Sequence, residues 1–191
     1  MNKLRKGIRI LFCKGDFLFY LLVIVGLVFL TQRVLNLSAI EGSSMAPTLV
    51  TQERVVGLRQ QKVKRFDIVI FDAPDEKGKQ YVKRVIGLPG ETVHYQEGQL
   101  MIDGQKVVEP YLASTSMEEA GASIDHYQVP EDAYFVMGDN REVSKDSRMF
   151  GAISRESIIG QVSYIYWPPN KISAVKSYEM KASHDESLVI Q

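Results

Sequence analysis

Three segments of the chain contain side chains that could perform chemistry together, and the first is a turn of small residues around Ser44. In Gly42-Ser43-Ser44-Met45-Ala46-Pro47, small residues precede the serine and a proline follows it within three residues. This composition predicts a tight turn that could present a hydroxyl group. It is more typical of a plain linker, so Ser44 needs a partner base before it can be considered a nucleophile.

The second segment, Lys79–Ile86, is rich in β-branched residues and predicts a strand. Alternation along a strand places Tyr81, Lys83 and Val85 on one face. Apolar neighbours disfavour the charged amine, and a pKa lowered from ~10.4 by about 2 units would make Lys83 a general base near pH 8. A lysine whose amine reaches solvent at a sheet edge is the more common alternative.

The third segment, Gly138–Arg148, follows the apolar run Tyr134–Met137 and is dense in side chains that cap turns and pair charges. A solvated loop is its common interpretation. Because it follows directly on a predicted strand, it could instead form a rigid hydrogen-bonded wall beside a site.

The three histidines, His94, His126 and His184, stand beside no distinctive motif. A Ser-His-Asp triad and a histidine metal site therefore have poor support, and we expect neither a metal nor a cofactor. The single cysteine, Cys13, cannot form an intramolecular disulfide. A formal net charge of zero gives no basic excess of the kind that favours nucleic-acid binding.

The elements that must position these segments are mostly strands. β-branched and aromatic runs, separated by turn dipeptides such as Glu97-Gly98 and Asp103-Gly104, predict strands at 65–71, 79–86, 92–95, 99–102, 105–108, 134–137 and 160–166. We predict a loop at 114–127 and a short helical turn at 154–159. The expected fold class is mainly β, with antiparallel sheets forming the catalytic domain after one N-terminal transmembrane helix.

The helix is predicted from the uncharged run Phe17–Leu30, which extends to Leu37 with one internal charge, Arg33. These residues are enough to cross ~30 Å of hydrocarbon at ~1.5 Å per residue. A buried core helix would show a polar face, which this run lacks. A cleaved signal peptide, cut near residues 37–39, would leave Ser44 close to a free end.

Charge then orients the span. Residues 1–16 contain five basic side chains and one acid, which predicts a cytoplasmic N-terminus. We therefore expect a cytoplasmic basic segment at 1–16, a transmembrane anchor at 17–37, an extracytoplasmic domain at 38–176 and a polar mobile tail at 177–191.

The three segments follow a membrane span in the order serine turn, lysine strand and polar segment. In this order they resemble the type I signal peptidase family, which are the bacterial leader peptidases with a Ser/Lys dyad. Within the family they resemble the single-span, Gram-positive-like branch. The resemblance covers about residues 15–175. The motifs that carry it are Gly42-x-Ser44-Met45-x-Pro47-Thr48-Leu49, Arg65-x-Asp67-Ile68-Val69, Tyr81-Val82-Lys83-Arg84-Val85-Ile86-Gly87-Leu88-Pro89-Gly90-Glu91, Glu109-Pro110-Tyr111-Leu112, Gly138-Asp139-Asn140-Arg141 and Ser144-x-Asp146-Ser147-Arg148.

The resemblance implies a membrane-bound serine endopeptidase that removes N-terminal signal peptides from secreted preproteins after small residues in an A-x-A pattern. It implies that Ser44 is the nucleophile and that neutral Lys83 is the general base. Ser144 would hydrogen-bond Lys83, and Tyr81 would pack beside it.

The resemblance assigns further supporting roles around the dyad. Asp146 and Arg148 would form a charge pair near the site, and Asp139 would brace the same wall. Some members of the family carry a serine at the position of Gly42, where its hydroxyl is a second oxyanion donor. This sequence has glycine there, so the assigned donor is the backbone N–H of Ser44.

The implied partners are secretory preproteins and the lipid bilayer, with the secretion machinery as a further partner and no nucleic acid. The implied location is the cell membrane, with a single span. A signal-peptidase-like factor for pilus or surface-protein assembly is the alternative, although the presence of both Ser44 and Lys83 favours an enzyme. Self-cleaving repressors share the Ser/Lys chemistry, but they need a DNA-binding domain and no span.

Overall fold

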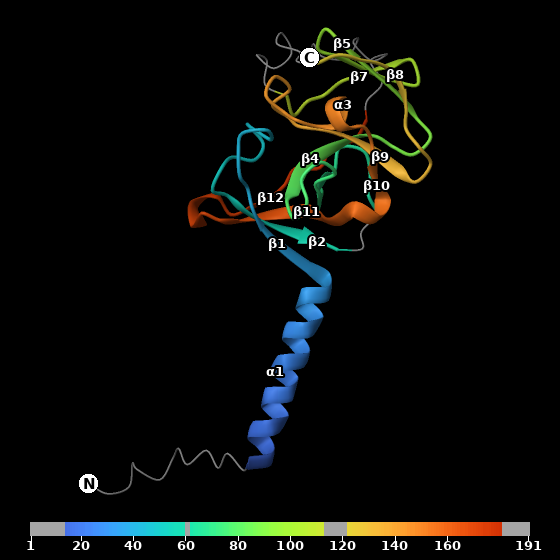
Figure 1. The fold of residues 1–191 in the computed structure, drawn as a ribbon. Helices are drawn as coiled ribbons and strands as arrows, with labels where there is room; N and C mark the ends of the chain where they lie inside the picture. The colour runs from blue at the N-terminus through green and yellow to red at the C-terminus, as the bar shows by residue number, and fades with distance from the viewer. Residues whose placement is uncertain (1–13, 60–61, 113–121, 181–191) are drawn as a thin grey trace, which may run out of the picture. The chain divides into compact units, whose positions relative to one another are not determined.

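The computed structural model describes residues 14–59, 62–112 and 122–180, and the chain divides into two units at Val34 (Figure 1). The first unit contains helix α1, Lys14–Val34. Among the described residues it is the one helix long and apolar enough to cross a membrane, with a mean hydropathy of 2.1 over Phe17–Val34. The last three residues of the predicted span, 35–37, lie in a strand of the second unit.

The described side chains of α1 are exposed and apolar from Phe17 through Phe29. A helix that presents apolar side chains on every face is stable only where its surroundings are not water. The composition of α1 therefore suits a bilayer rather than the surface of a water-soluble domain.

The second unit consists of two antiparallel sheets, which confirms the predicted fold class (Figure 1). The large sheet has the order β1-β2-β11-β3-β4-β9-β10, and β12 pairs with β11. Its strands are β1 (Leu35–Ala39), β2 (Arg54–Leu58), β3 (Ile68–Asp72), β4 (Gln80–Gly87), β9 (Ala133–Met137), β10 (Ile153–Ser154), β11 (Ile158–Trp167) and β12 (Ser173–Ala174).

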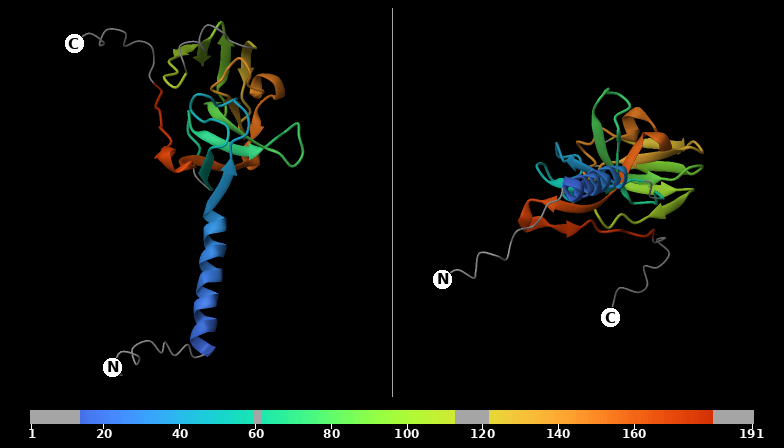
Figure 2. Two further views of the ribbon diagram at one scale, coloured as in Figure 1. Left: turned by 90° about the vertical axis from the view of Figure 1, so that its left-hand side faces the viewer. Right: turned by 90° about the horizontal axis from the view of Figure 1, so that it is seen from below.

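The small sheet has the order β7-β6-β5-β8. Its strands are β5 (Thr92–Gln96), β6 (Gln99–Ile102), β7 (Gln105–Val107) and β8 (Ile124–Gln128). The short helices are α3 (Ser147–Phe150), η1 (Arg155–Ser157) and η2 (Pro169–Lys171). In both views of Figure 2 the connection between β3 and β4, in green, projects from this unit.

The central strands have continuous apolar sequences because their side chains are buried on both faces of the sheet. In β9 every residue is buried, and alternate side chains enter different clusters. Phe135 and Met137 pack with Val93 and Tyr95 of the small sheet, whereas Tyr134 packs with residues of β3 and β4. The large sheet thus has both faces covered, and the small sheet covers part of one of them.

Two predicted boundaries need correction. The strand predicted from Arg65 begins at Ile68, because Phe66 adopts a φ of 68° in a turn that precedes it. The loop predicted at 114–127 contains β8 at its end, since Ile124–Gln128 pairs with β5 despite a sequence poor in strand formers. Residues 113–121 lie outside the described residues.

Strands β1, β2, β10 and β12 were not predicted, because each is short or lacks a clear alternating pattern. The helical turn predicted at 154–159 is the 3-10 helix η1. Of the predicted tail, residues 181–191 lie outside the described residues, and Tyr178 packs against Tyr111, with ring centroids 5.5 Å apart.

Candidate active site

The turn around Ser44 is fixed from below by apolar side chains and from the side by a backbone hydrogen bond. Met45 and Leu49 are fully buried in the core beneath the turn. The carbonyl oxygen of Ser44 accepts a hydrogen bond of 3.1 Å from the N–H of Asn140. Ser44 itself is half-buried. The serine hydroxyl is therefore held on an anchored turn and not on a linker.

Gly42 adopts a φ of 83°, in the left-handed region that glycine reaches without a steric penalty. No heavy atom lies within 4 Å of the position that a Cβ would occupy. Backbone conformation, and not lack of space, is therefore what favours glycine two residues before Ser44.

Lys83 comes from β4, where it pairs with Val69 of β3. Its Nζ lies 2.6 Å from the Oγ of Ser44 and 5.6 Å from the centroid of the Tyr81 ring. The residue is 4% exposed. The strand face predicted from alternation is confirmed, since Tyr81 and Val85 pack in one apolar cluster.

Burial lowers the pKa of Lys83 to about 8, because an ammonium group is disfavoured away from water. The carboxylates of Asp146 and Asp139 oppose this shift, and the guanidinium of Arg148 reinforces it. A substantial fraction of the amine is therefore neutral in mildly alkaline solution. In that form its lone pair can accept the hydroxyl proton of Ser44.

The polar segment 138–148 forms a wall in which Asp146 organises the backbone. Its carboxylate accepts from the N–H of Gly138 at 3.0 Å and from the backbone N–H of Arg148 at 3.2 Å, so it caps α3. The predicted charge pair is formed, with Arg148 Nε 2.8 Å from Asp146 Oδ1. The segment is thus a buried hydrogen-bonded structure and not a solvated loop.

Gly138 lies where this wall meets the catalytic turn. A Cβ at this position would stand 2.2 Å from Ser144 Oγ and 2.4 Å from the carbonyl oxygen of Ser44, so any side chain here would force the turn or Ser144 to move. Ser144 is buried, and within the described part of the chain its hydroxyl has no hydrogen-bond partner. The hydrogen bond predicted between Ser144 and Lys83 is therefore not formed in this structure.

Asp139 is fully buried and pairs with Arg84 of β4. Alternation along this strand predicts that Arg84 points away from Lys83, but it predicts no partner for Arg84. Arg84 donates to the two carboxylate oxygens at 2.8 and 2.6 Å, and it also donates to the carbonyl of Phe66. The wall is thereby bonded to the strand that carries Lys83.

A second buried pair, Arg141 with Glu109, was also missed. Arg141 lies in the family motif Gly138–Arg141, and Glu109 lies in the family motif Glu109–Leu112. These motifs were the only indication in the sequence that the two residues matter. Arg141 Nη1 donates to Glu109 Oε2 at 2.9 Å.

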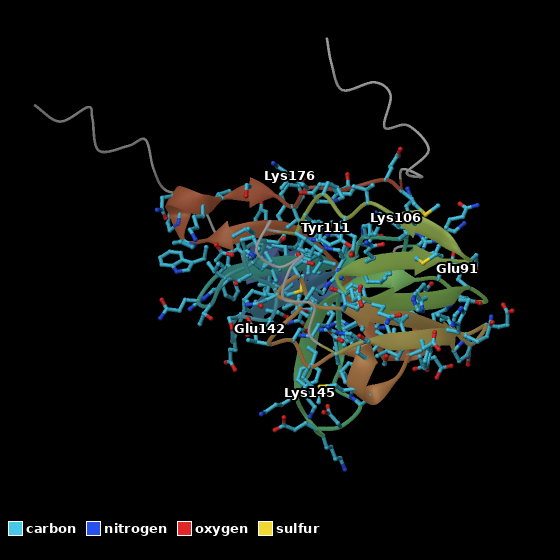
Figure 3. All side chains as sticks on the ribbon, turned by 90° about the horizontal axis from the view of Figure 1, so that it is seen from above. Glu91, Lys106, Tyr111, Glu142, Lys145 and Lys176 are labelled. Carbon is cyan, nitrogen blue, oxygen red and sulfur yellow. The ribbon has the colours of Figure 1, made fainter. Side chains whose placement is uncertain are left out.

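A cleft of about 680 Å³ opens beside Ser44 and Lys83. Residues from β1, from the first half of β4 and from the serine turn line it. Lys145, at its rim, forms an ion pair with Asp75 on the connection between β3 and β4; Figure 3 shows the Lys145 side chain against that connection.

Four of the eight predicted site residues line this cleft: Gly42, Ser44, Tyr81 and Lys83. The other four belong to the polar segment 138–148: Asp139, Ser144, Asp146 and Arg148. His94 and His126 lie on strands β5 and β8 of the small sheet and are not among the residues that line the cleft. His184 lies outside the described residues.

Comparison with known proteins identifies the family of the chain. A model of the family "Signal peptidase, peptidase S26" matches residues 14–167. Signal peptidase IB of Staphylococcus aureus strain COL is 39% identical, covering 78% of this chain and 84% of the relative. Signal peptidase I of Bacillus licheniformis is 42% identical, covering 70% and 77%.

A solved signal peptidase I from Enterococcus faecalis V583 aligns at 40% identity over 53% of this chain and 97% of its own, with a TM-score of 0.49. The family match spans the helix α1, the serine turn, the lysine strand and the polar wall in one alignment. The chain therefore belongs to the signal peptidases of the S26 family, which are serine peptidases.

Proposed function

We propose that this signal peptidase cleaves secreted preproteins after small residues, with Ser44 as nucleophile and neutral Lys83 as general base. The observation that carries the proposal is the 2.6 Å separation of Lys83 Nζ and Ser44 Oγ, combined with a lysine pKa of about 8. A nucleophile and a base within hydrogen-bond reach are the minimum arrangement for covalent catalysis.

The reaction then proceeds in two proton-balanced steps. Neutral Lys83 takes the hydroxyl proton as Ser44 Oγ bonds to the scissile carbonyl carbon, and the ammonium returns that proton to the leaving amine. The acyl-enzyme remains with Lys83 neutral again. The same amine next takes a proton from water as the water oxygen attacks the ester carbon. The ammonium then gives that proton to Ser44 Oγ as the ester C–O bond breaks, which releases the acid product and restores neutral Lys83.

The negative charge on the tetrahedral oxygen needs a donor, and the backbone N–H of Ser44 is the one we assign. Gly42 contributes no side-chain donor. Its positive φ orients the turn instead, and Thr51 Oγ1 anchors this conformation by donating to the Gly42 carbonyl at 2.8 Å.

The substrate would bind as an extended strand. β1 is the edge of the large sheet, and β9 pairs with β4 only from Arg84 onward, so residues 80–83 leave a second backbone edge unpaired within the described residues. Both edges line the cleft. A peptide between them would gain main-chain hydrogen bonds on two sides and present its carbonyl to Ser44.

The apolar side chains of Met45, Ile70 and Val82 line the cleft close to the serine turn. They suit small apolar substrate side chains and leave polar ones without partners, which supports the small-residue preference before the cut.

We assign the remaining residues to positioning. The ring of Tyr81 covers Lys83 and keeps it desolvated. Asp139 fixes the wall to β4 through Arg84, while Asp146 and Arg148 hold the backbone at Gly138. Ser144 would accept a hydrogen bond from Lys83 after the amine leaves Ser44 Oγ.

The anchor and the chemistry fit one topology. The basic residues before α1 favour a cytoplasmic N-terminus, which puts residues 38–176 outside the cytoplasm of the cell membrane. A signal peptide places its own apolar core in the bilayer and its cleavage site at the outer surface, and β1 follows α1 without an intervening linker.

The test is cleavage of a model preprotein by the full-length chain in proteoliposomes. We expect Ser44→Ala and Lys83→Ala each to reduce kcat/KM by at least ~10³-fold. Lys106→Ala removes an exposed lysine of β7 and is the matched control, with cleavage unchanged. Cleavage near the wild-type rate by either dyad variant would refute the assignment.

A further inference from the structure

The small sheet brings together three side chains that no part of the peptidase site uses. His94 lies on β5, and Asp125 and His126 are consecutive residues of β8. The pairing of the two strands shifts between Val93 and Tyr95, so Asp125 and His126 both oppose His94 across a β-bulge. A bulge re-aims side chains, and here it directs two adjacent residues toward one partner.

The three side chains contact one another directly. His94 Nδ1 lies 3.0 Å from Asp125 Oδ1, and the Nδ1 of His126 contacts the same oxygen. The two imidazole rings have centroids 5.0 Å apart. One ligand atom from each residue lies within 4.8 Å of the others. Two imidazoles and one carboxylate are thus already gathered at a single point.

The bulge sets the backbone conformation at His126. This residue has a φ of 44°, in the left-handed region, where histidine is found more often than most other non-glycine residues. The bulge also interrupts the backbone pairing between β5 and β8, so a side-chain link here would stabilise the small sheet.

The sequence alone predicted no histidine metal site, because the pairing of β5 with β8 that gathers these residues was not predicted. From this geometry we propose that His94, Asp125 and His126 form a binding site for one divalent transition-metal ion, with Zn²⁺ as the reference ion. Imidazole nitrogens suit Zn²⁺, Cu²⁺ and Ni²⁺ but not Mg²⁺ or Ca²⁺. Around Zn²⁺, ligand atoms at about 2.0–2.2 Å form a tetrahedron whose corners are roughly 3.3 Å apart.

The present separations need only small side-chain rotations to reach that geometry. The side chains of Asp125 and His126 are 80% and 74% exposed, so they can rotate without disturbing the core. Water would fill the fourth position. Because none of the three residues lines the catalytic cleft, the ion would fasten β8 to β5 and take no part in peptide cleavage.

The experiment is titration of Zn²⁺ into the tag-free full-length chain in detergent micelles, followed by calorimetry and thermal unfolding. Every variant carries Cys13→Ser, so that the one thiol cannot bind the ion. We expect one Zn²⁺ per chain, an increase in Tm on binding, and no comparable response to Mg²⁺.

His94→Gln, Asp125→Asn and His126→Gln should each weaken Zn²⁺ binding by at least about tenfold. His184→Gln removes the remaining histidine of the chain and is the matched control, with binding unchanged. Ser44→Ala should bind Zn²⁺ as the wild type does, which separates this site from the proposed peptidase mechanism. Co²⁺ bound to the wild type should show the visible absorption of a tetrahedral site.

The proposal is overturned if no Zn²⁺ binds at concentrations up to about 1 mM, which corresponds to an affinity near −4 kcal/mol. It is also overturned if the three variants bind with the affinity of the wild type, or if His184→Gln abolishes binding. Unfolding of the metal-free variants at the Tm of the metal-free wild type would show that the substitutions leave the fold intact.

Discussion

Lys83 Nζ lies 2.6 Å from Ser44 Oγ, and Lys83 is 4% exposed on a strand where its neighbours on the same face are apolar. The short separation and the burial act together. An exposed lysine at this distance would carry its proton and could only donate to the hydroxyl oxygen. Burial lowers the pKa of Lys83 to about 8, so the same pair of atoms can transfer a proton in the direction that activates Ser44.

The first prediction concerns the pH dependence of cleavage. Because protonated Lys83 cannot accept the hydroxyl proton, kcat/KM should rise about tenfold per pH unit on the acidic side and level off above an apparent pKa near 8. The measurement is kcat/KM from pH 6 to 10 with a short peptide substrate that carries no titrating group. A rate that is flat from pH 6 upward would show that Lys83 is not the base.

The second prediction uses the charges around the amine. The carboxylate of Asp146 raises the pKa of Lys83, and the guanidinium of Arg148 lowers it. Asp146→Asn should therefore move the acidic limb of the pH profile to lower pH, whereas Arg148→Gln should move it to higher pH. Asn and Gln keep part of the hydrogen bonding at each position.

These two variants also distinguish electrostatics from damage to the wall. Loss of structure alone would reduce kcat/KM at every pH and leave the apparent pKa in place. Glu76→Gln removes an exposed carboxylate that pairs with Lys79, and it is the control for nonspecific charge effects. Shifts of Asp146→Asn and Arg148→Gln in the same direction would contradict the assignment.

The third prediction is that Lys83 destabilises the folded chain. Below about pH 8, Lys83 is protonated in both the folded and the unfolded chain. The free energy of unfolding is then lowered by the full cost of removing the charged amine from water. Between pH 8 and about 10.5 the folded amine is neutral while the unfolded one still binds a proton, so the penalty declines. A shift from 10.5 to about 8 corresponds to about 3 kcal/mol at most.

Lys83→Met should accordingly unfold at a higher Tm than the wild type at pH 7, and the difference should shrink by pH 10. Thermal unfolding of the detergent-solubilised chain at both pH values provides the comparison. Lys106→Met, at an exposed position, should change the free energy of unfolding by less than about 0.5 kcal/mol. An equal gain at pH 7 and pH 10 would mean that packing, and not the charge, is responsible.

Local patterns in the sequence predicted the conformation of two parts of this site, whereas the roles of Ser44 and Lys83 came from the family resemblance. Alternation along the strand put Lys83 beside Tyr81 and Val85, and the spacing of small residues predicted the turn at Ser44. Both inferences depend only on neighbours along the chain, which explains why they hold.

The contact between Ser44 and Lys83 was expected only from the family resemblance, and other contacts between distant residues escaped prediction. The partner of Arg84 is Asp139, 55 positions away, and their contact requires the pairing of β4 with β9. His94 and His126 meet at a bulge in the pairing of β5 with β8, and β8 itself was predicted as part of a loop. Register and bulges are set by tertiary packing, which composition does not reveal.

The last prediction concerns Gly138, whose role is steric. Its φ is not in the left-handed region, so alanine is compatible with the backbone, but the added Cβ would stand 2.4 Å from the carbonyl oxygen of Ser44 and 2.2 Å from Ser144 Oγ. Relief requires the serine turn to move away from the wall. A displacement of about 1 Å at a catalytic atom can reduce the rate by ~10²-fold.

We therefore expect Gly138→Ala to lower kcat by roughly 10²-fold, with a smaller effect on KM, while the chain still folds. The measurement is steady-state cleavage together with Tm. Gly104→Ala is the informative control, because Gly104 has a φ of 76° and no heavy atom lies within 4 Å of the position that its Cβ would occupy, so it tests backbone strain without a clash. Wild-type kcat in Gly138→Ala would show that the turn at Ser44 tolerates displacement, and that its contact with the wall does not position the nucleophile.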